Sequence, residues 1–110
     1  MMRIGRVVRI DVAKADEYRR YHDEIWPEIL AALREAGIRN YSIFLKDDML
    51  FSYYEYIGPP EELDARLKQA AAAPRMREWW DLMEPMQIPL PTRKPGEWWA
   101  TMEPVFFFAG

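Results

Sequence analysis

The sequence predicts an α+β domain with the element order β-α-β-β-α-β, which is the ferredoxin-like pattern. Three observations support this prediction. Apolar residues alternate with a period of two near the N-terminus, helical segments follow that run and a later hairpin, and an Asp-Asp turn at 47–48 joins two apolar runs. With 110 residues the chain has the length of one ordinary domain, so we expect residues 1–110 to form a single unit.

The first predicted element is a strand over residues 3–12. Ile4, Val8 and Ile10 recur with a period of two, and Arg6 is the exception to this alternation. Because a strand sends successive side chains to opposite faces, the apolar residues share one face of the predicted sheet.

Residues 16–36 are predicted to be helical, with Asp16 able to cap the start and Gly37 ending the segment. Pro27 lacks a backbone N–H, so we expect it to kink this helix or to restart it. The residues that share one face at helical spacing are Tyr18, Ile25, Trp26, Ile29 and Leu33.

Residues 39–46 and 49–57 are predicted to form a β-hairpin. Both faces of its strands carry apolar or aromatic side chains, whereas an antiparallel sheet with one hydrated face alternates apolar and polar residues. We therefore expect both faces to be covered, one by the helices and the other by a second copy of the same sheet. Such a partner would make a two-fold homodimer with a site inside each sheet.

The second half of the chain begins with two predicted helical pieces, from residue 60 to about residue 73 and over residues 74–83. Residues 84–96 hold four prolines and are predicted to form a long loop, and loops of this length in compact domains are often functional. The last predicted strand covers residues 98–108, where Pro104 requires an edge or a bulge.

The composition bounds the possible partners. Half of the residues are apolar and 15% are aromatic, which is more than a chain of this length buries alone, so we expect a subunit interface or an aromatic cleft. A net charge of -3 without a basic stripe argues against nucleic-acid binding. The N-terminus lacks the apolar core of a signal peptide, and no apolar run reaches the roughly 18 residues of a membrane span. We therefore expect a cytoplasmic protein without membrane contact.

Several kinds of site are excluded by missing residues or motifs. Cysteine is absent, which rules out disulfides, thiolate metal sites and cysteine nucleophiles, and which fits a cytoplasmic location. The chain also lacks a glycine-rich phosphate loop, an HExxH motif and a GxSxG motif. We accordingly expect no metal site.

His22 is the only histidine, and its ordinary pKa of about 6.5 suits proton transfer near neutral pH. Tyr18 lies four residues earlier, so the two side chains share a helix face. Spacing alone also allows a structural histidine that bonds a backbone carbonyl or Tyr18.

Two adjacent tryptophan pairs, Trp79-Trp80 and Trp98-Trp99, are the other notable feature. Neighbouring residues on a helix or strand point in different directions, so each pair is expected to place one ring in the core and the other elsewhere. A tryptophan ring can pack on the C–H groups of a sugar while its N–H donates a hydrogen bond. The pairs therefore favour an aromatic cleft beside the proline-rich loop, with core or dimer packing as the alternative for each ring.

Glu55 and Glu103 lie in predicted strands, where a carboxylate on a covered face needs a partner. Each could act as a second acid/base. Each could instead pair with an arginine such as Arg6 or Arg9, and we favour this structural interpretation.

Four stretches of the chain resemble the L-rhamnose mutarotase family: EYRRYHDEIWPEI, AGIRNYSIFL, WW at 79–80 and PGEWWATMEPVF. The motifs H-x-x-[IV]-W-P-E and [RH]-N-Y-[SA]-I are quite specific to that family, and the similarity runs in register over nearly the whole chain. The resemblance implies a dimeric α+β barrel built from ferredoxin-like subunits. It also implies an isomerase that interconverts the α and β anomers of L-rhamnose or a related 6-deoxy aldose without a cofactor.

The resemblance also carries residue roles. It places the family's proton-donating histidine on His22 and the substrate-contacting tyrosines on Tyr18 and Tyr41. The substrate-contacting tryptophans fall on Trp79 and Trp80. The chain departs from the family near its end, where Pro104-Val105-Phe106-Phe107 replaces the usual E-V-F followed by histidine or tyrosine, a change that bears on sugar preference or on the dimer contact.

Anomer interconversion needs one proton delivered to the ring oxygen and one removed from the anomeric hydroxyl. We expect His22 to act as the acid at the ring oxygen, while a tyrosine, a carboxylate or a water could fill the second role. Two other function classes stay open on the sequence. One is a cofactor-free oxygenase of the same barrel type, and the other is a sugar-binding module without catalysis.

Overall fold

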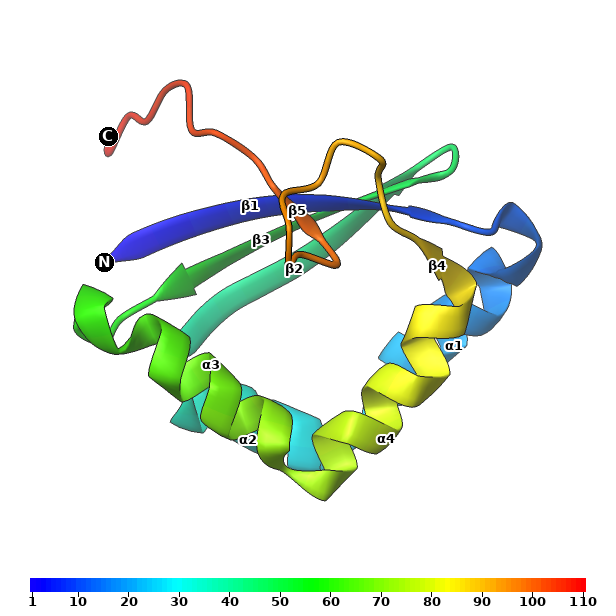
Figure 1. The fold of residues 1–110 in the computed structure, drawn as a ribbon, viewed down its shortest axis with the longest axis horizontal. Coiled ribbons are helices and arrows are strands. Elements are labelled where there is room, and N and C mark those ends of the chain that lie inside the picture. The colour runs from blue at the N-terminus through cyan, green and yellow to red at the C-terminus, as the bar shows by residue number, and fades with distance from the viewer.

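The computed structural model describes residues 1–110 and contains a curled antiparallel sheet with all four helices on one side of it (Figure 1). Its strand order is β2-β3-β1-β4, with β5 also pairing with β1, which is the arrangement of a ferredoxin-like fold. The α+β prediction is therefore confirmed. The strands are β1 (Met2–Ile10), β2 (Ile38–Lys46), β3 (Met49–Tyr56), β4 (Gln87–Ile88) and β5 (Ala100–Thr101).

Proline marks the starts of two of the four helices. The helices are α1 (Ala15–Asp23), α2 (Pro27–Glu35), α3 (Leu63–Ala72) and α4 (Pro74–Met83). Proline suits a first helical position because its ring presets φ and its missing N–H has no partner there in any helix. Pro27 accordingly restarts the helix, as one of the two expected outcomes, after α1 has ended at Asp23. None of the helices is long and apolar enough to cross a membrane.

A β-bulge in β2 decides which side chains face the helices. Asn40 and Tyr41 together oppose the single residue Tyr54 on β3, and Asn40 adopts a φ of 51°. The Tyr41 ring stacks on the Tyr54 ring with a centroid distance of 5.4 Å. The bulge thus places Tyr41 on the inner, helix-facing side of the sheet.

The core is split into two clusters on the inner face. The larger cluster lies under α1, α2 and α4, and the smaller one lies near the start of β2 and the end of β3. The buried members of the larger cluster include Val8, Ile10 and Leu50 from the sheet, which are 0%, 1% and 2% exposed. Only 18 of the 110 residues are buried, so much of the apolar half of the chain stays accessible.

The end of the chain differs from the prediction. The expected strand over residues 98–108 is reduced to the two residues of β5, and the segment after Thr101 has no regular structure. Pro104 cannot donate a ladder hydrogen bond, which accounts for the early end of this strand. The expected loop over residues 84–96 contains the short strand β4. Its two residues are too few to show the apolar-polar alternation from which a strand is predicted.

Candidate active site

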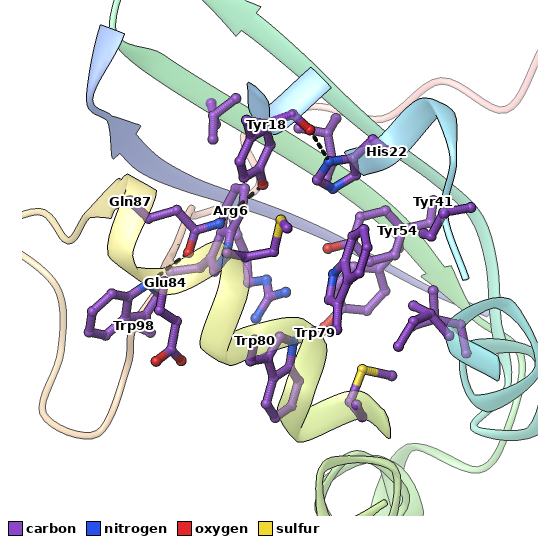
Figure 2. A pocket seen from close by; sticks show the side chains of 18 of the residues that line it. Arg6, Tyr18, His22, Tyr41, Tyr54, Trp79, Trp80, Glu84, Gln87 and Trp98 are labelled. Atoms are coloured by element: carbon purple, nitrogen blue, oxygen red, sulfur yellow. Dashed lines mark hydrogen bonds between the residues drawn. The ribbon is translucent and has the colours of Figure 1, made fainter. Parts of the chain in front are cut away.

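A cavity of about 900 Å³ opens between the inner face of the sheet and the helices (Figure 2). Most of its lining is apolar. All five residues named above as site candidates line it: Tyr18, His22, Tyr41, Trp79 and Trp80. Their shared location agrees with the expectation, and their roles stay predictions.

His22 lies in the last turn of α1 and bonds the backbone of its own helix. Its Nδ1 is 2.8 Å from the carbonyl oxygen of Tyr18. Because a carbonyl oxygen can only accept, Nδ1 carries the proton of the neutral ring and Nε2 is left with a free lone pair. The carbonyl contact of a structural histidine is therefore present, but in a ring that also lines the cavity.

The surroundings of His22 favour its neutral form. Burial lowers the pKa of His22 from its ordinary value of 6.5, and this effect outweighs the bond to Tyr18 and the charge of Asp23, which act in the opposite direction. Aromatic rings pack on both sides, with ring centroids 4.4 Å away for Tyr18 and 5.2 Å away for Trp79. At neutral pH the imidazole is thus a proton acceptor at Nε2.

Tyr18 is held at its hydroxyl by a second residue. The Gln87 amide nitrogen donates to the Tyr18 hydroxyl oxygen at 3.0 Å, and the Trp98 indole N–H donates to the Gln87 amide oxygen at 2.8 Å. Burial raises the pKa of the Tyr18 phenol, so the hydroxyl keeps its proton throughout the neutral range. The sequence analysis missed Gln87, whose only signal is a lone polar residue between apolar neighbours in the proline-rich segment.

Both tryptophan pairs follow the expected pattern. Trp79 is 5% exposed and Trp80 is 40% exposed, so this pair divides between the core and the cavity rim. Trp98 is 38% exposed, whereas Trp99 packs against the larger core cluster, so this pair divides as well. All four rings also line the cavity.

Arg6 places a cation in this largely apolar cavity. Its guanidinium carbon is 5.3 Å from the Tyr54 ring centroid and 5.7 Å from that of Trp99. Its Nε is buried without a hydrogen-bond partner, and Figure 2 shows the side chain reaching into the cavity. The break in the alternating pattern at residue 6 was the signal for this residue, which the sequence analysis did not assign to the site.

The two strand carboxylates lie outside the cavity. Glu55 is on the outer face of the sheet, where it accepts hydrogen bonds of 2.7 Å each from the Asn40 amide and the Tyr53 hydroxyl. These bonds lower the pKa of Glu55. Glu55 thus has the favoured structural role, although its partners are not arginines, and Glu103 lies in the exposed segment after β5.

The family model described as L-rhamnose mutarotase matches residues 3–108. The chain belongs to the L-rhamnose mutarotase family. It is 42% identical over 97 residues to an L-rhamnose mutarotase of Acidiphilium cryptum, a match that covers 86% of this chain and 88% of that one. It is 35% identical over 86 residues to an L-rhamnose mutarotase of Lactiplantibacillus plantarum, covering 78% of this chain and 80% of that one.

Two solved structures confirm the fold expected for the L-rhamnose mutarotase family. An L-rhamnose mutarotase from Formosa agariphila is 24% identical, covers 98% of this chain and 99% of its own, and has a TM-score of 0.75. A type-II polyketide cyclase from Streptomyces glaucescens is 20% identical, covers 100% and 99%, and has a TM-score of 0.76. The second likeness shows that this fold also serves other chemistry, so the reaction has to be argued from the site.

Proposed function

We propose that the protein is a mutarotase that interconverts the α and β anomers of L-rhamnose or a related 6-deoxy aldose without a cofactor. One observation carries the proposal: His22, whose Nε2 is free to accept a proton, lines a cavity together with Tyr18 and tryptophans. Membership of the L-rhamnose mutarotase family, with relatives of that name at about 40% identity, supports it.

The cavity walls suit a deoxy sugar. Trp79 and Trp80 offer apolar ring surface on which the C–H groups and methyl group of a 6-deoxy aldose can pack. Tyr18, Tyr41 and Arg6 supply hydroxyl and guanidinium groups that can bond the sugar hydroxyls. A 900 Å³ space is ample for a monosaccharide.

Ring opening moves one proton from the anomeric hydroxyl to the ring oxygen. The bond between the anomeric carbon and the ring oxygen breaks, its electron pair goes to the ring oxygen, and a carbonyl forms at the anomeric carbon. We infer that neutral His22 first takes the hydroxyl proton at Nε2 and then delivers it, as imidazolium, to the ring oxygen. One imidazole can serve both oxygens because they are bonded to the same carbon. Rotation of the aldehyde and the reverse sequence close the ring as the other anomer.

This sequence modifies the role first expected for His22. The sequence analysis expected an acid at the ring oxygen, whereas a neutral ring with its proton on Nδ1 begins as a base. The acid role follows in the second half of the same step.

The proposal is tested by measuring anomer exchange of L-rhamnose by NMR saturation transfer. The His22→Gln variant should lose about 10²–10⁴-fold of the enzymatic rate, which is the usual contribution of positioned proton transfer. Circular dichroism and thermal unfolding serve as controls for folding. A folded His22→Gln variant that exchanges anomers as fast as the wild type would exclude this role, and sugar binding without exchange in the wild type would favour a binding module. L-Fucose and other aldoses assayed in parallel would identify the preferred sugar.

We also propose that the protein is a homodimer joined through the outer face of the sheet. Val7, Phe44 and Phe51 face outward there in register, and Phe44 is 65% exposed. Apolar side chains follow in the C-terminal segment, where Val105 and Phe106 are 96% and 85% exposed. Exposed apolar surface of this kind is typical of an interaction site.

A further inference from the structure

Three side chains at the cavity wall form a hydrogen-bond chain whose direction is fixed. The Trp98 indole donates to Gln87, and Gln87 donates to the Tyr18 hydroxyl, as drawn in Figure 2. Gln87 is 8% exposed and Tyr18 is 6% exposed, so neither bond is readily replaced by solvent.

The direction follows from the chemistry of tryptophan. An indole N–H can only donate, so the Gln87 atom that faces Trp98 must be the amide oxygen. The amide nitrogen then faces Tyr18, and the Tyr18 oxygen has to accept. The hydroxyl proton of Tyr18 is therefore not used by Gln87 and has no other protein acceptor.

The hydrogen-bonding role of His22 toward the cavity is also fixed, and it is the opposite of that of Tyr18. Its Nδ1 proton goes to the Tyr18 carbonyl, so its Nε2 can only accept. The same helical turn thus offers one free hydrogen-bond donor, the Tyr18 hydroxyl, and one group that can only accept, the His22 Nε2. A hemiacetal has the matching pair, because its anomeric hydroxyl can donate a proton whereas its ring oxygen, which bears no hydrogen, can only accept.

We propose that Gln87 and Trp98 are positioning residues that hold Tyr18 as a hydrogen-bond donor to the ring oxygen while His22 accepts from the anomeric hydroxyl. The inference rests on the proposed mutarotase function. The Tyr18 hydrogen bond stabilises the negative charge that develops on the ring oxygen as its bond to the anomeric carbon breaks. The raised pKa of Tyr18 keeps the proton on the phenol, so the proton that ends on the ring oxygen comes from His22.

The deciding variant is Gln87→Glu. An ionised carboxylate only accepts, so it would take one hydrogen bond from Trp98 and the other from Tyr18, which removes the Tyr18 proton from the sugar. The rate at saturating sugar should fall about 10²-fold, as for the loss of one preorganised donor. Acidification should raise the ratio of variant to wild-type rate toward one, because a protonated carboxyl group donates to Tyr18 as the amide does. The His22 pKa of each protein, measured from its Cε1–H signal, corrects the ratio for the effect of the new carboxylate on His22.

Two further variants complete the test. Gln69→Glu is the matched control, since Gln69 is exposed on α3 and is not among the residues that line the site cavity, and its rate ratio should stay near one at every pH. Trp98→Phe removes the indole N–H and frees the amide to flip, so it should cause a smaller loss without pH dependence. It also tests the proposal should Gln87→Glu fail to fold.

The outcomes separate the two proposals. If the wild type exchanges anomers and the Gln87→Glu ratio does not rise on acidification, the positioning role is wrong and the mutarotase function stands. If the wild type exchanges no aldose anomers, the mutarotase function is wrong and the positioning role falls with it. If the ratio of variant to wild-type rate rises on acidification for Gln87→Glu but not for Gln69→Glu or Trp98→Phe, both the mutarotase function and the positioning role are supported.

Discussion

At the residue scale, two opposing effects act on the pKa of His22. Burial among aromatic rings disfavours its charged form, whereas the Tyr18 carbonyl and Asp23 favour it, and burial prevails. The single proton of the neutral ring is held at Nδ1. Its protonation therefore has consequences for both the rate and the stability of the protein.

The first prediction concerns titration of His22. Its pKa should lie below 6.5, and the anomer-exchange rate should fall on acidification through that pKa as Nε2 becomes protonated. Because the chain has one histidine, its Cε1–H signal in the NMR spectrum is directly assignable. A pKa at or above 6.5 would contradict the conclusion that burial outweighs the Tyr18 carbonyl and Asp23 at His22.

The same shift predicts a pH-dependent free energy of unfolding. The unfolded chain binds a proton at His22 more readily than the folded chain does, since the folded pKa is the lower one. Stability should therefore fall as pH decreases below about 6.5, through the lowered pKa, and His22 should contribute no pH dependence above that range. Chemical denaturation of wild type and His22→Gln measures this directly, because only the wild type should lose stability there through residue 22.

Arg6 provides a prediction in which stability and activity move in opposite directions. Arg6→Met removes a cation whose buried Nε has no partner, so the free energy of unfolding should stay constant or rise by about 1 kcal/mol. The KM for the sugar should rise about tenfold if Arg6 bonds a sugar hydroxyl, equivalent to about 1.4 kcal/mol. Arg9→Met is the control, since Arg9 is an outer-face residue that pairs with Asp48 near the surface at 2.7 Å. A clear loss of stability in Arg6→Met would mean that its contacts with aromatic rings outweigh the unpaired donor.

The sequence predicted the site residues better than their interactions. His22 and Tyr18 were singled out because histidine occurs once and helical spacing is regular, and their predicted roles came from the resemblance to the L-rhamnose mutarotase family. Gln87 and Arg6 were not found, because their partners are distant in the sequence and only the folded chain brings them near. Gln87 bonds Tyr18, 69 residues away, and Arg6 lies near the rings of Tyr54 and Trp99, about 50 or more residues away. Hydrogen-bond direction depends on which groups meet, and no local pattern records it.

At the scale of elements, the end of α2 depends on Gly37. This residue has a φ of 88°, and an added Cβ would lie 3.1 Å from Cε1 of Tyr56. The left-handed conformation favours glycine, and an added methyl group would crowd the Tyr56 ring, which would have to shift by a few tenths of an ångström. The packing of α2 on the sheet is thus coupled to a single glycine.

Gly37→Ala should destabilise the protein by about 1–3 kcal/mol, because it adds backbone strain and a contact with Tyr56. Gly96→Ala is the matched control, as Gly96 has a φ of 85° with nothing within 4 Å of an added Cβ. The difference between the two losses, measured by denaturant unfolding, gives the cost of crowding alone. Equal losses would show that the Tyr56 ring moves aside.

Element boundaries were predictable where local signals were strong. Prolines at the first positions of α2 and α4 mark helix starts, and the predicted 74–83 helix matches α4 in the structure. The strand over residues 98–108 was wrong because its apolar, aromatic run is typical of a strand, whereas Pro104 within it cannot donate a ladder hydrogen bond. The Met102 N–H still donates to the Gly5 carbonyl oxygen at 2.8 Å, and the mostly apolar segment 103–110 makes no ladder bond to the sheet.

The whole molecule exposes more surface than its mass requires. Its accessible surface is 7761 Å², whereas a monomeric protein of 13.1 kDa has about 6,400 Å² by the usual scaling. The open cavity and the exposed C-terminal segment contribute to the excess. This agrees with the excess of apolar residues in the composition, and it supports the proposed dimer.

The dimer predicts a specific effect of a charge on the outer face. Phe44→Asp should shift the protein from dimer to monomer in sedimentation velocity at micromolar concentration, because a carboxylate buried in an apolar interface has no partner. Val12→Asp is the control, since Val12 is 63% exposed but lies in the 3-10 turn Val12–Lys14, outside the strands. A monomeric wild type, or a dimeric Phe44→Asp variant, would contradict an interface through this face.

The bond between Trp98 and Gln87 also constrains how this chain can change during evolution. Surface loops usually accept insertions and deletions freely. Here both ends of the proline-rich loop are anchored at the cavity, so length changes should be tolerated between residues 90 and 96 and selected against at either anchor. The glycine at position 96, whose surroundings are empty, lies inside the tolerant stretch. Descendants of this chain can therefore vary the shape of the loop beside the cavity without altering the groups that hold Tyr18.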